Sequence, residues 1–160
     1  MNSGWTKTLS ADVFKDSLVV ECIGAVDEAN SFIGLAKVFA SKEDVRAILK
    51  EIQKKLFRIC EEFAMGRKIT EKELEWINSE IKKLENEVPK MKSFVILEKD
   101  PATAFLSVAR AIVRRAERRA FTLYRNGLVS QNSVEWLNRL SHLLYLLTLR
   151  EGEEFEEVHF

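Results

Sequence analysis

Apolar residues recur at steps of three and four along most of this 160-residue chain, the spacing that places them on one face of an α-helix. The clearest stripe consists of Val45, Leu49, Ile52, Leu56, Ile59 and Phe63. Ser41 before this stripe is a suitable N-cap, and Gly66 after it is a suitable helix stop. A second stretch with the same period runs from about Leu18 to Phe39. The first part of the chain therefore predicts two helices, each with one buried face.

Cap residues mark two further helices. Thr70 and Glu73 have the spacing of a capping box, which opens a third helix that ends before Pro89. The Asp-Pro pair at 100–101 combines an N-cap with a first-turn proline and opens a long fourth helix, which ends near Gly127.

The last third of the chain predicts one more helix, from about Asn132 to Arg150. It has apolar residues on nearly every side, so we expect it to be the most buried. The short apolar run Met91–Leu97 has no obvious strand partner, and we expect an ordered loop there. The acidic tail Glu151–Phe160 is expected to be frayed.

Composition supports a helical fold. Gly and Pro supply only 8 of the 160 residues, too few for the frequent turns of a sandwich or barrel. Helices with short connections favour an antiparallel bundle. The sequence thus predicts an all-α, five-helix bundle in a single domain over residues 1–160, which includes a short N-terminal segment at 1–16.

Charge and cysteine content limit the classes of binding partner and the cellular compartment that we expect for this protein. The 25 basic and 25 acidic side chains cancel, which argues against nonspecific nucleic-acid binding. No stretch approaches the roughly 18 consecutive apolar residues of a membrane helix, and the first ten residues lack the apolar core of a secretory signal. Cys22 and Cys60 lie among apolar neighbours, which predicts reduced thiols. We expect a cytoplasmic protein with neither a nucleic acid nor a membrane as its partner.

Arginines gather on one side of the fourth predicted helix. At 100° per residue, Arg110, Arg114 and Glu117 share a face, Arg118 lies at its edge, and Phe121 falls inside it. One interpretation is a solvated face held by ion pairs between neighbouring turns. The other is an anion site, because guanidinium groups one turn apart can bind phosphate oxygens in pairs.

Polar residues also interrupt the apolar fifth helix. Asn138, Ser141, His142 and Tyr145 share one side. They form either a hydrogen-bonded network in the core or the edge of a ligand site. On the first helix, Asp27 lies in a stripe of small and polar residues, which favours pairing with an arginine.

A metal site built by the chain alone is not predicted. His142 and His159 are too few and too far apart for zinc, and no cysteine pair has ligand spacing. Phosphate-binding and nucleophile motifs of the Gly-rich type are also absent from the sequence.

Four segments resemble motifs of the PduO-type ATP:cob(I)alamin adenosyltransferases. Lys15-Asp16 together with residues 24–34, G-A-V-D-E-A-N-S-F-I-G, resembles the K-D and G-x-V-D-E-x-N-S-x-I-G segment. Residues 52–57 resemble I-Q-x-x-L-F, and residues 109–118 resemble A-R-x-x-x-R-R-A-E-R. Residues 137–141 match L-N-R-L-S. The four segments follow the order of the family and span most of the chain.

The resemblance implies a five-helix bundle that assembles as a homotrimer, with active sites between adjacent subunits. It implies transfer of the 5′-deoxyadenosyl group of ATP to the cobalt of reduced cobalamin, with release of triphosphate. Lys15, Arg114, Glu117, Arg118 and Asn138 would then hold ATP and its Mg²⁺, and Arg114 would also act in catalysis.

The resemblance also implies a corrinoid site. Arg110 would pair with Asp27 near the corrin, and both belong to the implied catalytic group. Phe94 matches the aromatic residue that displaces the lower ligand of cobalt. Ser141 and His142 are expected to contact the corrinoid.

Three segments depart from the family pattern. Residues 5–13, W-T-K-T-L-S-A-D-V, replace a T-R-T-G-D-x-G-x-T-like loop that wraps the triphosphate. Glycine is favoured in such loops because backbone amides reach phosphates only through tight turns. Residues 97–100, L-E-K-D, replace L-P-G-G, and residues 140–142, L-S-H, replace L-S-D.

Two hypotheses follow from the retained and the changed motifs. In the first, the protein is an adenosyltransferase with a divergent phosphate loop, in which Thr6, Lys7 and Thr8 supply contacts. In the second, it is a non-catalytic trimeric paralogue that binds corrinoid or nucleotide, or acts only in assembly.

Overall fold

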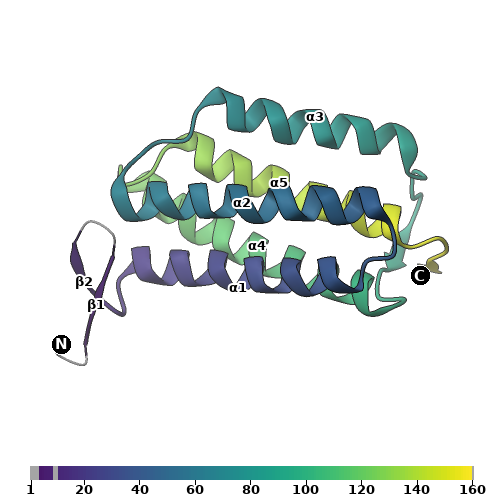
Figure 1. The fold of residues 1–160 in the computed structure, drawn as a ribbon, viewed down its shortest axis with the longest axis horizontal. Coiled ribbons are helices and arrows are strands. Elements are labelled where there is room, and N and C mark those ends of the chain that lie inside the picture. Colours follow the sequence, from purple (N-terminus) through teal and green to yellow (C-terminus); the bar gives the residue numbers. More distant parts are fainter. Residues whose placement is uncertain (1–3, 9–10, 160) are drawn as a thin grey trace.

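The computed structural model describes residues 4–8 and 11–159, and these residues form five helices and two small two-stranded sheets (Figure 1). The helices are α1 (Leu18–Phe39), α2 (Glu43–Met65), α3 (Glu71–Glu87), α4 (Pro101–Arg125) and α5 (Gln131–Glu151). The strands are β1 (Trp5–Lys7), β2 (Asp12–Phe14), β3 (Phe94–Ile96) and β4 (Glu156–Val158). The predicted five-helix bundle is confirmed.

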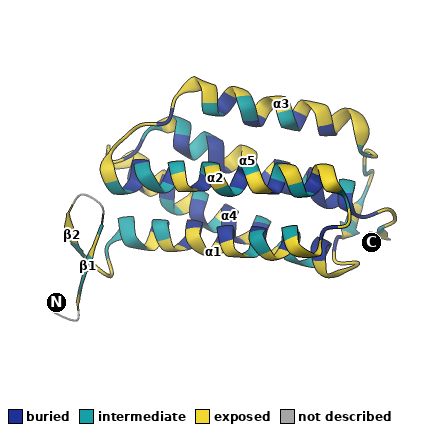
Figure 2. Cartoon of the chain, in the orientation of Figure 1, coloured by how far each residue is buried: buried dark blue, intermediate teal, exposed yellow. Residues whose placement is uncertain are grey.

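The helices pack in a fixed neighbour order. Helix α1 packs mainly on α4 and α2, α4 on α5, and α5 on α3 (Figure 1). Glu21 pairs with Arg119 at 2.9 Å, and Glu28 pairs with Arg115, so α1 and α4 run antiparallel. Buried positions turn toward the inside of the bundle, and α3 keeps much of its outer side exposed (Figure 2). As predicted, α5 is the most enclosed of these helices, with twelve buried residues including Trp136.

Local caps set most helix ends. Asp100 accepts a hydrogen bond from the Thr103 amide at 2.9 Å, and the Thr103 hydroxyl accepts one from the Asp100 amide at 3.0 Å. The predicted capping box of Thr70 and Glu73 is present, and Gly66 ends α2 at φ +73°. Such left-handed backbone is where glycine is favoured.

One predicted boundary was wrong by one residue, and another agreed with the structure. The N-cap of α2 is Lys42 rather than Ser41, because the Ser41 amide and hydroxyl instead donate to the buried carboxylate of Glu151, at 2.5 and 2.7 Å. Helix α5 begins at Gln131, next to the predicted Asn132, and the Ser130 side chain caps it.

The expectations for the loop at 91–97 and for the tail were also wrong. Phe94–Ile96 forms strand β3, which pairs antiparallel with strand β4 from the C-terminal tail. Sequence patterns within a short window cannot reveal this pairing, because the partner strand lies at the other end of the chain. The last tail residue, Phe160, lies outside the described residues.

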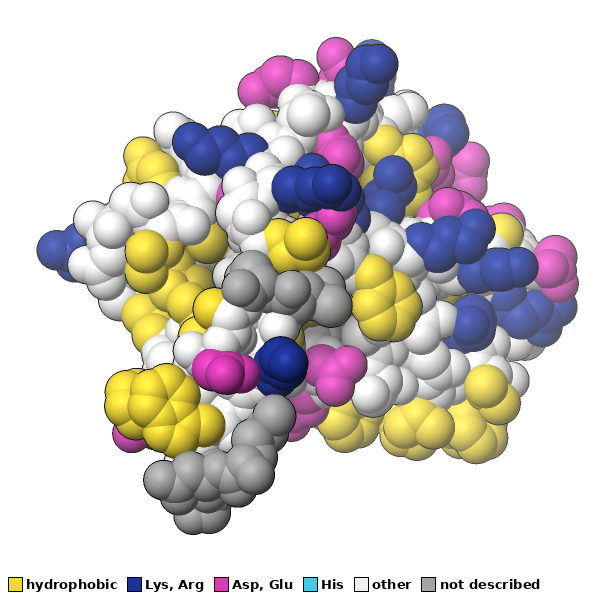
Figure 3. Space-filling view, turned by 60° about the vertical axis from the view of Figure 1, so that its left-hand side comes forward, with side chains coloured by type: hydrophobic (Ala, Val, Ile, Leu, Met, Phe, Trp, Pro, Cys, Tyr) yellow, Lys and Arg dark blue, Asp and Glu magenta, His cyan; other side chains and the backbone are white. Residues whose placement is uncertain are grey.

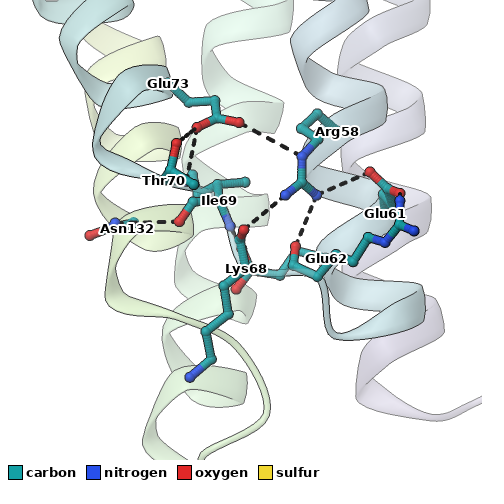
Figure 4. A network of polar contacts seen from close by, with 9 residues as sticks. Arg58, Glu61, Glu62, Lys68, Ile69, Thr70, Glu73 and Asn132 are labelled. Atoms are coloured by element: carbon teal, nitrogen blue, oxygen red, sulfur yellow. Dashed lines mark hydrogen bonds and ion pairs between the residues drawn. The ribbon is translucent and has the colours of Figure 1, made fainter.

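A buried carboxylate ties the end of α2 to the start of α5. Glu62 is 1% exposed and accepts hydrogen bonds from the amides of Ile69 and Ser130, at 2.8 and 2.6 Å. Beside it, Arg58 donates to the backbone carbonyls at 67 and 68 and contacts Glu73 (Figure 4). These contacts hold the 66–70 connection against the bundle.

The described helices include none that is both long and apolar enough to cross a bilayer.

Candidate functional site

Four arginines of α4 fall into two groups according to whether they form an ion pair within the chain. Arg115 and Arg119 reach α1, where they pair with Glu28 and Glu21. Arg114 and Arg118 are exposed, and within the part of the chain that the structure describes neither guanidinium has an ion-pair partner. The first group is held by ion pairs between α4 and α1, whereas the ion pairs between neighbouring turns that would make the face of Arg114 and Arg118 a merely solvated one are not found among the described residues. The second group therefore keeps its positive charge available to an anion.

A hydrogen bond to α5 borders the second group. Asn138 donates from Nδ2 to the half-buried Glu117 carboxylate at 3.0 Å. Because Glu117 lies three residues after Arg114, this bond places a carboxylate and an amide beside the two unpaired guanidinium groups. The structure thus brings together four of the five residues predicted to hold ATP.

Arg110 lies beside a hollow of about 650 Å³ that is also lined by Phe94, Tyr145 and Val158. The Arg110 Nε is buried and has no hydrogen-bond partner among the described residues. A buried donor without an acceptor is costly, so a water, a ligand or another subunit that offers an acceptor here would stabilise Arg110. Phe94 is 76% exposed at the rim of this hollow.

The other two residues predicted to bind corrinoid make contacts inside the chain. Ser141 is buried and donates to the carbonyl of Asn138 at 2.9 Å. His142 contacts the Glu85 carboxylate of α3, with 3.0 Å between Nε2 and Oε1, and stacks on Tyr145. Neither lines the hollow beside Arg110.

Tyr145 was placed on the polar side of the fifth helix but was not among the residues expected to contact the corrinoid. It lines both the hollow beside Arg110 and a second hollow of about 560 Å³ between the end of α3 and α5. Its spacing of three and four residues from His142 and Ser141 is the signal that placed it on this side of α5.

Lys15 and Asp27 lie on another part of the chain. Lys15 is exposed directly after β2. Asp27 is exposed on α1 and lines a hollow of about 330 Å³ together with Asn30 and Cys60. The described residues contain no ion pair between Asp27 and Arg110, which line different hollows. The predicted pair therefore does not form within one chain.

The segment that replaces the phosphate loop forms a hairpin of β1 and β2. Trp5 faces Phe14 across it, with 3.9 Å between ring centroids, and apolar side chains are exposed around this end of the molecule (Figure 3). Thr6, Lys7 and Thr8 line a largely apolar hollow of about 890 Å³ over α1 and α2. Leu9 and Ser10 of this segment lie outside the described residues.

Both cysteines are free thiols, as predicted. Burial raises the pKa of Cys22 to about 12, with a smaller contribution from Cys60. Burial likewise raises the pKa of Cys60 to about 11. Neither thiol is therefore activated as a nucleophile near neutral pH.

Comparison with known proteins identifies relatives along nearly the whole chain. The family model described as cobalamin adenosyltransferase matches residues 2–151. A corrinoid adenosyltransferase of Bacillus subtilis is 34% identical over 153 residues, which cover 90% of this chain and 79% of that protein. The corrinoid adenosyltransferase PduO of Salmonella typhimurium is 30% identical over 148 residues, which cover 88% of this chain but only 44% of that longer protein.

Solved structures give the same result. A variant of the PduO-type adenosyltransferase of Lactobacillus reuteri complexed with ATP has a TM-score of 0.79 and 26% identity, over 93% of this chain and 89% of that one. Another variant of the same protein, complexed with cobalamin and ATP, has a TM-score of 0.85 and 25% identity, over 99% of this chain and 95% of that one. The match of a family model to residues 2–151, supported by these relatives, places the chain in the cobalamin adenosyltransferase family.

Proposed function

We propose that this protein transfers the 5′-deoxyadenosyl group of ATP to the cobalt of a reduced corrinoid. The observation that carries the proposal is the pair of unpaired guanidinium groups, Arg114 and Arg118, beside the Glu117–Asn138 hydrogen bond. The L. reuteri relative, which shares the fold, is complexed with both ATP and cobalamin.

The reaction requires positioning and charge stabilisation more than acid–base chemistry. The electron pair of the reduced cobalt attacks C5′ of the ribose, a cobalt–carbon bond forms, and the C5′–O bond breaks. Triphosphate leaves with the electrons of that bond and carries the developing negative charge. Arg114 and Arg118 would stabilise this charge through paired hydrogen bonds to phosphate oxygens.

Mg²⁺ enters this scheme together with ATP. Among the residues that the structure describes, no cluster of three or more acidic, histidine or cysteine side chains could form a cage for a metal ion. Mg²⁺ that accompanies a nucleotide needs only one or two carboxylates, because phosphates and water supply its other ligands. Glu117 fits this requirement, since it lies beside both unpaired arginines.

The corrinoid would occupy the hollow lined by Phe94, Arg110 and Tyr145. Phe94 would pack on the lower face of the corrin and keep the axial ligand and water away from cobalt. Ser141 and His142 would act from behind this surface, because both already make contacts within the chain.

Assembly as a homotrimer would complete the site. Arg110 has a buried Nε without a partner, and Asp27 lies exposed at a different hollow, so an ion pair between neighbouring subunits would satisfy both. Apolar side chains exposed on α1 and α4, among them Val38, Val108 and Phe121, offer the surface that such an interface buries. Light scattering should give three times the mass of the chain, and a monomer at micromolar concentration would contradict this assembly.

A non-catalytic paralogue is the alternative function, and the N-terminal hairpin is the observation that favours it. Its described residues form paired strands over an apolar hollow and lack the Gly-Asp-x-Gly sequence of a phosphate loop. The two free thiols support a reducing, cytoplasmic environment under either function.

Anaerobic incubation with ATP and chemically reduced cobalamin tests the proposal, with the loss of cob(I)alamin absorbance as the readout. Turnover by the unmodified protein is expected. Arg114→Ala should lower ATP affinity by roughly 10- to 100-fold, because it removes a charge-assisted contact worth about 1.5–3 kcal/mol. Arg119→Ala is the matched control, since Arg119 pairs with Glu21 of the same chain. No turnover by the unmodified protein would favour the paralogue, and an unaffected ATP affinity in a folded Arg114→Ala protein would refute the anion site.

A further inference from the structure

Asn30 on α1 is buried, and its amide oxygen is unsatisfied. The residue is 8% exposed, and Oδ1 has no hydrogen-bond partner among the described residues. The backbone carbonyl of Asn30 accepts from Gln53 Nε2 at 3.3 Å, so this contact between α1 and α2 does not use the Asn30 side chain. An acceptor that is buried without a donor is costly, so a donor that reached Oδ1 from outside the chain would stabilise it.

The hollow of about 330 Å³ between α1 and α2 gives such a donor room. Gly24, Asp27 and Asn30 line it from α1, where they follow one another at three-residue steps and share one side of the helix. Asp27 is the charged side chain of this lining, and it forms no ion pair with any described residue. A carboxylate beside an unpaired amide oxygen suits a cationic group with several N–H donors.

Gly24 leaves space over this side of α1. An added Cβ at Gly24 would meet no atom within 4 Å, whereas one at Gly34 would lie 3.1 Å from the Gln53 side chain. Contacts inside the chain therefore account for the glycine at 34 but not for the glycine at 24. Because glycine is unfavourable inside a helix relative to alanine, Gly24 fits a position where a group from outside the chain packs closely on the helix backbone.

Arg110 carries the complementary group. Among the described residues, the buried side-chain atoms without a hydrogen-bond partner are Asn30 Oδ1, the Nε atoms of Arg110 and Arg115, and Trp136 Nε1. Asn30 Oδ1 is the acceptor in this set, and the others are donors. Trp136 lies in the core and Arg115 already pairs with Glu28, whereas Arg110 lines a hollow. Arg110 is therefore the donor that a second copy of the chain could bring to Asn30.

We infer that Gly24 and Asn30 complete the site on α1 that receives the partner subunit's Arg110. The Asp27 carboxylate takes one edge of the guanidinium, Asn30 Oδ1 accepts a further N–H, and Gly24 gives the side chain room. A guanidinium has five N–H donors in a fixed plane, so a carboxylate alone leaves several of them unsatisfied. The inference rests on the proposed assembly and adds two positioning residues to the proposed pair of Asp27 and Arg110.

Association of the substrate-free protein tests this site, with a dilution series followed by mass photometry as the measurement. Asn30→Ala removes the acceptor, and Asn30→Asp keeps it. Ser31→Ala is the matched control, because the Ser31 hydroxyl donates within its own helix, to the Asp27 carbonyl at 3.1 Å. Asn30→Ala should weaken each subunit interface by about 10- to 100-fold, the loss of one charge-assisted bond, while Asn30→Asp and Ser31→Ala should stay within about threefold of the unmodified protein.

Gly24→Ala separates this role from a loss of helix stability. Alanine is a better helix former than glycine or asparagine, so both Gly24→Ala and Asn30→Ala favour α1 itself. Weaker assembly of these variants would therefore come from the interface, and far-UV circular dichroism should show an unchanged helical content. A Gly24→Ala protein that assembles as tightly as the unmodified one, or an Asn30→Ala protein that loses helical content, would overturn the inference.

A double variant identifies Arg110 as the group that Asn30 receives. Arg110→Lys keeps a positive charge for Asp27 but lacks the planar fork of donors. Asn30→Ala should therefore cost far less in the Arg110→Lys background than in the unmodified protein. An equal loss in both backgrounds, or unchanged assembly of Asn30→Ala, would refute the inference. Because these measurements need no substrate, a protein that shows the coupling but no turnover would support this site and count against the proposed function.

Discussion

Replacing the buried carboxylate of Glu62 should destabilise the bundle far more than replacing its neighbour Glu61. Glu62 is 1% exposed and accepts from the Ile69 amide, the Ser130 amide and, at 3.4 Å, the Ser133 hydroxyl. Glu62→Ala leaves two backbone donors without their acceptor at a site closed to water. An unsatisfied buried donor costs about 1–3 kcal/mol, so we expect a loss of roughly 2–5 kcal/mol in the free energy of unfolding.

Glu61→Ala is the matched control. Glu61 pairs with Arg58 at 3.1 Å and Arg67 at 2.8 Å, and these side chains are partly exposed. Such pairs contribute about 0–1 kcal/mol. Glu62→Gln keeps the size and one carbonyl acceptor, so its effect should lie between the two alanine variants.

Urea denaturation followed by far-UV circular dichroism measures all three variants, at one fixed protein concentration because subunit association contributes to stability. In a chain of this size 1 kcal/mol corresponds to roughly 2–4 °C, so Glu62→Ala should also melt about 5–15 °C lower. A loss below about 1 kcal/mol, or one no larger than that of Glu61→Ala, would show that the connection at 66–70 is held by other contacts.

Three further predictions concern the aromatic residue, the hairpin and a buried thiol. Phe94→Ala should slow adenosylation strongly when cob(II)alamin and a mild reductant are supplied, and much less when cob(I)alamin is supplied; equal losses in both assays would indicate a structural role. Calorimetry should give ATP affinity on the order of 100-fold weaker than in relatives with the glycine-containing loop, the loss of about two charge-assisted contacts; low-micromolar affinity would show that Thr6–Thr8 replace them. The free energy of unfolding should fall as pH rises above about 9, because unfolded thiols ionise at their ordinary pKa. In the folded protein the pKa of Cys22 is raised to about 12, so stability is complete below pH 9 and is lost as pH approaches 12. Cys22→Ala should show a smaller fall over this range in pH-dependent urea titrations.

The sequence was sufficient to predict the five helices and most of their ends. Each of these amphipathic helices depends on the spacing of its buried residues and on cap residues within three or four positions of its ends. Both signals are local in the sequence. The capping box at Thr70 and Glu73 and the glycine at 66 formed as predicted. At Ser41 a distant group, the Glu151 carboxylate, accepts the hydrogen bond of the predicted cap residue. The N-cap of α2 therefore lies one residue later than the local pattern predicted.

Only the tertiary structure decided which polar residues are available to a ligand. Arg114 and Arg115 are adjacent in the same motif, yet the packing of α1 against α4 gives Arg115 a partner in Glu28, while no described residue forms an ion pair with Arg114. The pairing of β3 with β4 also joins segments from distant parts of the chain. Spacing along one helix fixes the direction of a side chain, but the group that it meets depends on how separate elements pack, and that information is spread over the whole chain.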